Sequence, residues 1–93
     1  MLFAIYMLDK PDSEELRVQT GKSHGAYMAA NENGMRMGGP LYADDHKTMI
    51  GSMVVKDFVD RSSAEEFIAN EPYNKAGLFG TVLINPFGAF VDK

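Results

Sequence analysis

The sequence predicts one α+β domain over residues 1–93, with elements in the order βαββαβ and a four-stranded antiparallel sheet that carries two helices on one face. Three observations predict it. A chain of 93 residues suits one domain, because two would each be too small to bury a core. Four short apolar segments rich in strand formers are interleaved with two segments that begin with helix-capping residues. The right-handed crossover rule then makes this topology the leading one.

The first half of the chain contains a strand, a long helix and a second strand. Residues 2–8 are too short for a buried helix, and the polar segment that follows ends the strand. Either Asp12 or Ser13 can cap a helix that runs to about residue 31. Gly34 tolerates positive φ and so marks the stop before a strand over residues 35–42.

The second half predicts a strand, a short helix and a last strand. Residues 48–59 form the third strand after a polar turn, and residues 78–84 form the fourth. Ser62 and Glu65 have the spacing of a capping box, in which the serine caps the helix and the glutamate reaches back. This helix must end before Pro72, because the residue before a proline avoids helical geometry.

The strands do not alternate between apolar and polar residues, as a sheet covered on one face should. In the first strand, both faces are apolar: Leu2, Ala4, Tyr6 and Leu8 on one, Phe3, Ile5 and Met7 on the other. Two helices can cover only one face of the sheet. The apolar residues on the other face therefore predict a homodimer, packed face to face, with an α/β-barrel-like core. The alternative is that the apolar tail, with Phe87 and Phe90, folds over this face.

Composition excludes several classes of partner and site. A net charge of −4 disfavours nucleic acid and anionic membrane surfaces, which both attract basic proteins. The chain has no cysteine, so neither disulfides nor a thiolate metal site is expected, which fits a cytoplasmic location. Asp44, Asp45 and His46 could hold a metal, but a solvated turn is the simpler interpretation, and no motif demands a cofactor.

One histidine and one carboxylate are predicted to face inward. At 100° per residue, His24 falls near the middle of the apolar arc of the first helix, and Gly21 and Gly25 leave room beside its ring. Glu71 falls at the inward phase of the second helix and needs a partner, for which His24 is the natural candidate. Such a pair can set the tautomer for proton transfer. Spacing alone favours a structural polar pair, so both interpretations stay open.

Several short motifs resemble those of the YCII-related family, in the right order over nearly the whole chain. They are Glu71-Pro72-Tyr73 followed by Lys75-Ala76-Gly77-Leu78-Phe79, His24-Gly25-Ala26-Tyr27-Met28, and Gly38-Gly39-Pro40-Leu41.

The resemblance implies a ferredoxin-like fold that forms a dimeric α/β barrel, with His24 and Glu71 as an active-site pair. Family members usually have aspartate where this chain has Glu71. They often carry an arginine one turn before the histidine, where this chain has Gly21, with Arg17 one turn earlier. Characterised members resemble lyases that eliminate from small ring compounds.

Two functions follow as hypotheses. The first is a small-molecule enzyme, a lyase or isomerase, in which His24 and Glu71 move a proton while Tyr73, Tyr27 and Arg17 bind the substrate. The second is a dimer without catalysis that binds a small ligand or another protein. The sequence names neither the substrate nor the pathway.

Overall fold

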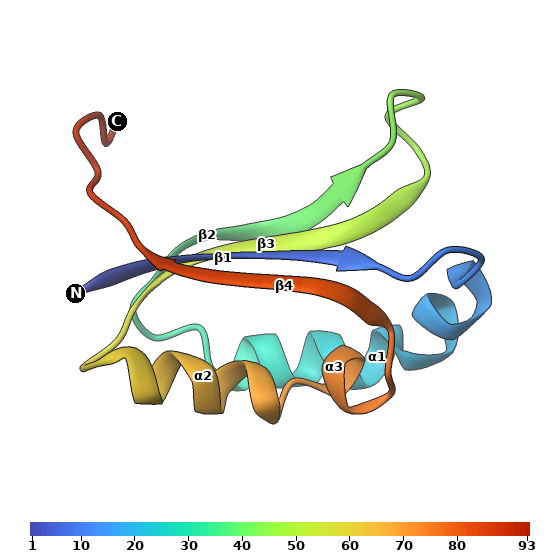
Figure 1. The fold of residues 1–93 in the computed structure, drawn as a ribbon, viewed down its shortest axis with the longest axis horizontal. Coiled ribbons are helices and arrows are strands. Elements are labelled where there is room, and N and C mark those ends of the chain that lie inside the picture. The colour runs from blue at the N-terminus through green and yellow to red at the C-terminus, as the bar shows by residue number, and fades with distance from the viewer.

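A four-stranded antiparallel sheet carries all of the helices on one face in the computed structural model, which describes residues 1–93 (Figure 1). The elements are β1 Leu2–Asp9, α1 Glu14–Ala30, β2 Met35–Tyr42, β3 Met49–Asp57, α2 Arg61–Ala69, α3 Pro72–Lys75 and β4 Phe79–Pro86. The strands lie in the order β2-β3-β1-β4, and every neighbouring pair is antiparallel. The predicted ferredoxin-like topology is therefore confirmed.

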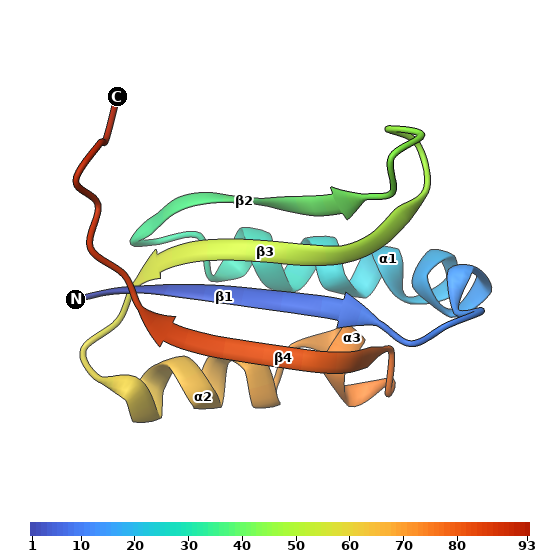
Figure 2. The same ribbon diagram turned by 45° about the horizontal axis from the view of Figure 1, so that its top comes forward.

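The core lies between the sheet and the helices. In β1, Phe3, Ile5 and Met7 point to the helices and are fully buried, because a strand sends alternate side chains to one face. Figure 2 shows α1 along the β2–β3 side of the sheet and α2 along the β4 side. No helix of the structure is both long and apolar enough to span a membrane.

Two local features differ from the sequence prediction. Asp60, not Ser62, caps α2: its carboxylate accepts from the backbone N–H of Ser63 at 2.8 Å. The helix therefore begins at Arg61, one residue before Ser62, and the Asp60 side chain satisfies one of its free N–H groups. The additional short helix α3 follows α2, because Pro72 ends one helix and suits the first position of the next.

A close approach of two strands depends on Gly51. A Cβ on this residue would lie 2.2 Å from the backbone oxygen of Met7, so no side chain fits between β3 and β1 at this position. β3 curves toward the hairpin with β2, as Figure 1 shows. Glycine at this position therefore has a steric cause.

The face of the sheet opposite the helices stays largely open. Met37 is 62% exposed and Leu83 54% exposed on this face. The chain after β4 rises away from the sheet and does not lie over it, with Phe90 fully exposed (Figure 1). An ion pair of Arg36 with Asp92 holds the tail beside β2. The alternative in which the tail covers this face is therefore wrong.

Candidate active site

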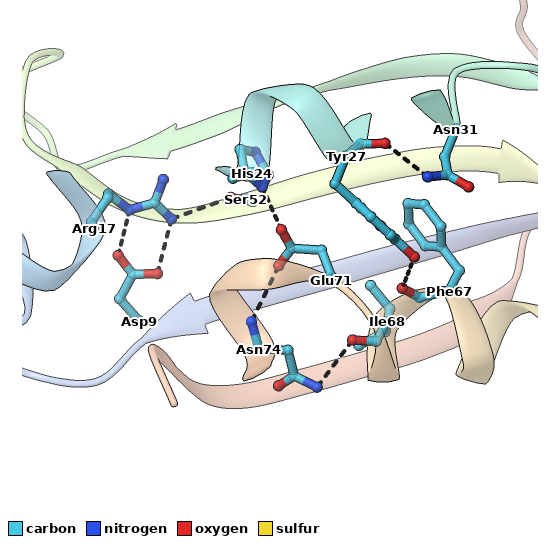
Figure 3. Close-up of polar contacts among 10 residues, drawn as sticks. All are labelled: Asp9, Arg17, His24, Tyr27, Asn31, Ser52, Phe67, Ile68, Glu71 and Asn74. Atoms are coloured by element: carbon cyan, nitrogen blue, oxygen red, sulfur yellow. Dashed lines mark hydrogen bonds and ion pairs between the residues drawn. The ribbon is translucent and has the colours of Figure 1, made fainter. Parts of the chain in front are cut away.

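His24 and Glu71 are in direct contact. Nδ1 of His24 lies 2.5 Å from Oε1 of Glu71 (Figure 3). The carboxylate is 0% exposed, whereas the imidazole keeps 22% of its surface exposed. With Glu71 ionised and the imidazole neutral, the carboxylate can only accept, so Nδ1 carries the proton and Nε2 is left as an acceptor.

Glu71 reaches this position by a route that differs from the sequence prediction. α2 ends at Ala69, so Glu71 does not continue its apolar stripe. It is instead the N-cap of α3, and its Oε2 accepts from the backbone N–H of Asn74 at 3.3 Å. One carboxylate therefore caps a helix with one oxygen and holds the imidazole with the other. The ionised form can accept in both contacts at once.

Arg17 is buried beside the pair and is itself held by a carboxylate. Its Nε donates to Oδ2 of Asp9 at 2.7 Å and its Nη2 donates to Oδ1 at 2.9 Å, a bidentate pair. Nη2 also donates to Oγ of Ser52 at 3.2 Å. Burial opposes the charged form, but the hydrogen bond and charge of Asp9 outweigh it, so the pKa of Arg17 lies above its ordinary value. A fixed cation therefore stands near His24.

One end of the guanidinium remains available. Nη1 of Arg17 makes no hydrogen bond within the chain and points away from Asp9 (Figure 3). Because Arg17 lines a cavity, this N–H group can donate to a ligand oxygen there. The arrangement suits an anionic oxygen, since a donor with full charge makes the stronger hydrogen bond.

Tyr73 packs between these two groups. Its ring stacks on the imidazole of His24, with centroids 4.1 Å apart and planes at 18°. The guanidinium carbon of Arg17 lies 4.6 Å from the centroid of the same ring. Burial raises the pKa of the Tyr73 phenol, so it is neutral over the ordinary pH range.

A cavity of about 300 Å³ joins these side chains. It opens between α1 and the strands β2 and β3, and Tyr73 reaches it from α3. Its lining residues are Arg17, His24, Met28, Met35, Gly38, Gly39, Pro40, Met49, Ser52, Met53, Val54 and Tyr73. Four methionines in this wall offer flexible, polarisable contacts that suit the faces and edges of aromatic rings.

Tyr27 lies apart from this cavity. Its hydroxyl donates to the backbone oxygen of Phe67 at 2.7 Å, and its ring packs on that of Phe67. Burial raises its pKa. Of the predicted site residues, the structure brings together His24, Glu71, Tyr73 and Arg17, and leaves Tyr27 in the packing of α1 on α2.

The polar turn between β2 and β3 is held by Asp45. Its carboxylate accepts from the backbone N–H groups of Lys47 and Thr48, at 2.8 and 2.9 Å, and from the Thr48 hydroxyl. The Thr48 hydroxyl contributes most to the lowered pKa of Asp45. Through these hydrogen bonds the Asp45 carboxylate closes the turn.

Sequence reasoning missed Asp9 and Ser52. Asp9 ends β1 and Ser52 lies in β3 opposite Met7, so the strand register brings both beside Arg17. The sequence contained a signal for Asp9, because an aspartate at the end of a strand lies close to the start of the helix that follows it. Ser52 had no such local signal, since its partner is 35 residues away.

The chain is similar to known proteins over nearly its whole length. Protein YciI of Escherichia coli is 31% identical over 94 residues, which cover 94% of this chain and 96% of that protein. The structure of 5-chloro-2-hydroxyhydroquinone dehydrochlorinase (TftG) from Burkholderia phenoliruptrix, in complex with 2,5-dihydroxybenzoquinone, has a TM-score of 0.88 at 30% identity over 95% of this chain and 94% of that chain.

A more distant structure shares the fold alone. An antibiotic biosynthesis monooxygenase has a TM-score of 0.53 at 13% identity, over 95% of this chain and 99% of that chain. A sequence model of the YCII-related domain matches residues 1–88. The chain therefore belongs to the YCII-related domain family.

Proposed function

We propose that this chain is a small-molecule enzyme of the lyase or isomerase kind, in which His24 transfers a proton in the cavity beside Arg17. The observation that carries the proposal is the 2.5 Å contact between His24 and the fully buried Glu71. The contact leaves Nε2 of a cavity-lining imidazole free to accept a proton. A histidine with a merely structural role would not need its second nitrogen free in a cavity.

Arg17 supplies the second functional group. Its free Nη1 can bind an oxygen that is anionic or becomes so during the reaction. The bidentate contact with Asp9 holds the guanidinium before any ligand arrives, so little ordering is required on binding. The methionine-lined wall favours a small planar ring with such an oxygen.

The related dehydrochlorinase supports an elimination on this kind of ring. In the proposed step, Nε2 of His24 takes a proton from the substrate. The step acts on the keto form of the ring, in which one hydroxyl proton has moved to the carbon that bears the leaving group. His24 removes the proton of a remaining hydroxyl group, the electrons of that O–H bond form a C=O bond and shift a ring double bond to this carbon, and the leaving group departs from it with its bonding pair as an anion. Glu71 balances the charge of the imidazolium, and Arg17 binds the ring oxygen on which charge develops.

The test is turnover of 5-chloro-2-hydroxyhydroquinone and a panel of halogenated phenols, followed by chloride release and by the absorbance of the quinone product. We expect His24→Asn to slow release by about 10² to 10⁴-fold, the usual contribution of a general base. The matched control is His46→Asn, since His46 has a φ of 62° in an exposed turn and asparagine tolerates that geometry.

Equal rates for the wild type and His24→Asn would contradict the proposed role of His24. Binding of the panel without turnover would favour the non-catalytic binding module instead.

We also propose that two copies pack through their open sheet faces and work as a cytoplasmic homodimer. Met37 and Leu83 are more than half exposed on this face, where a stable monomer seldom keeps apolar groups together. We expect Leu83→Glu to give a monomer in sedimentation velocity. Val18→Glu, on the exposed side of α1, is the control. A wild type that sediments as a monomer at all concentrations would contradict the dimer.

A further inference from the structure

The ring of Tyr73 is inserted between two side chains of one helix. Arg17 and His24 are seven residues apart on α1, which places them about 10 Å apart on the same face of the helix. Each nevertheless lies against Tyr73, at 4.6 Å for the guanidinium carbon and 4.1 Å for the imidazole centroid. The phenol ring thus occupies the space that separates the two.

Gly21 faces the hydroxyl end of this ring. Gly21 lies midway between Arg17 and His24, and a Cβ there would come within 3.6 Å of the Tyr73 hydroxyl oxygen. An added Cβ would therefore be in ordinary van der Waals contact with the phenol. Phe79 contacts the ring edge-on from β4, with centroids 5.9 Å apart and planes at 74°. The ring is buried.

Glu71 and Asp9 each orient one functional group, but neither touches both. Glu71 holds the Nδ1 side of His24, and Asp9 holds Arg17. The Tyr73 ring contacts both groups. Its place in the chain reinforces this role, because it follows Glu71 by two residues in the helix that Glu71 caps.

We propose that Tyr73 is a positioning residue, whose ring sets the separation and the relative orientation of His24 and Arg17 across the cavity. The proposal rests on the proposed function, in which one group moves the proton and the other binds an oxygen of the same substrate. A small ring must meet both at once, so a change of about 1 Å in their separation costs much of the rate. The operative part is the ring and not the hydroxyl.

The experiment compares Tyr73→Phe, which keeps the ring, with Tyr73→Leu, which removes it. Tyr27→Leu is the matched control, because it removes another partly buried tyrosine of the same core that does not line the cavity. The first measurement is the NMR signal of the His24 ring protons, which a stacked phenol displaces by its ring current. His46, in its exposed turn, serves as the internal reference.

We expect the His24 ring protons to have this displaced chemical shift in the wild type, Tyr73→Phe and Tyr27→Leu. In Tyr73→Leu we expect the displacement to disappear. The second measurement is binding of 2,5-dihydroxybenzoquinone by calorimetry. We expect affinity to fall about tenfold in Tyr73→Leu and to change less than about twofold in Tyr73→Phe and Tyr27→Leu, because only the first loses preorganisation.

The outcomes separate this proposal from the proposed function. An unchanged His24 signal in Tyr73→Leu, or equal losses of affinity in Tyr73→Leu and Tyr27→Leu, would overturn the positioning role. If the wild type neither binds the quinone nor turns over the panel, the proposed function fails. In that case the NMR comparison still decides whether the ring of Tyr73 stacks on His24 in solution.

Discussion

Glu71 holds His24 across 47 residues of chain while capping the helix that begins one residue later. Oε1 of Glu71 contacts the imidazole, whereas Oε2 accepts the capping hydrogen bond of α3. Orientation of the histidine and formation of α3 are therefore coupled, because both depend on the same carboxylate.

The first prediction concerns the tautomer of His24. In the wild type we expect nitrogen chemical shifts that report a proton on Nδ1 and none on Nε2, because the carboxylate can only accept. In Glu71→Gln the amide can donate or accept, so we expect a mixture of tautomers and about 10²-fold slower turnover. A single, unchanged tautomer in the variant would show that Glu71 does not determine it.

The second prediction concerns the cap of α2. Hydrogen bonds from the backbone and then the hydroxyl of Ser63 hold the pKa of Asp60 below its usual range. Its stabilisation is therefore present above the unfolded value near 3.9 and lost as pH falls through the folded value. We expect Asp60→Ala to lower the melting temperature at neutral pH, and the difference from the wild type to shrink in acid.

Ser62→Ala is the control for this prediction, because Asp60 and not Ser62 accepts the capping bond. An equal loss of stability in the two variants, measured by thermal unfolding, would favour the capping box instead.

The third prediction concerns the contact of β1 with β3. Gly51→Ala would push a methyl group to within 2.2 Å of the Met7 backbone oxygen, so the strands must move apart. We expect a loss of about 3 kcal/mol in the free energy of unfolding, at the upper end of the usual cost of overpacking. Gly39→Ala is the matched strand control, since nothing lies within 4 Å of its Cβ. Urea unfolding of both variants provides the comparison.

The fourth prediction concerns the buried pair of Asp9 and Arg17. Asp9→Ala leaves a buried guanidinium without its carboxylate, and we expect it to cost about 3–5 kcal/mol of stability. Removing both charges in Asp9→Ala with Arg17→Met should recover part of this loss, because no unpaired charge remains. A double-mutant cycle in urea measures the coupling. Additive effects would show that the pair contributes no interaction energy.

The fifth prediction concerns alkaline pH. Burial raises the pKa of both Tyr73 and Tyr27 in the folded protein. Their contribution to stability is therefore present below the unfolded value near 10 and is lost as pH rises through the folded values. We expect a late phase in the near-ultraviolet titration of tyrosine, which becomes smaller in Tyr73→Phe and in Tyr27→Phe. No change in that phase in either variant would contradict the assignment.

The order of elements could be predicted from the sequence because it depends on local patterns. The apolar run at residues 35–42 matches β2 at both ends, and Gly34 has the positive φ expected of a residue that follows a helix. The inward direction of His24 also follows from helical phase alone. Such features depend on neighbours a few residues away, so a single chain segment carries all the information.

The pairing of His24 with Glu71 follows from the sequence, but the other partners of the site side chains, and the element from which Glu71 acts, were decided only by tertiary structure. Glu71 was expected on α2, yet it meets His24 from the cap of α3. Tyr27 shares the inward face of α1 but turns its hydroxyl to Phe67. Ser52 reaches Arg17 through strand register. Helical and strand periodicity determine which face a side chain occupies, whereas packing between elements determines which distant group it meets there.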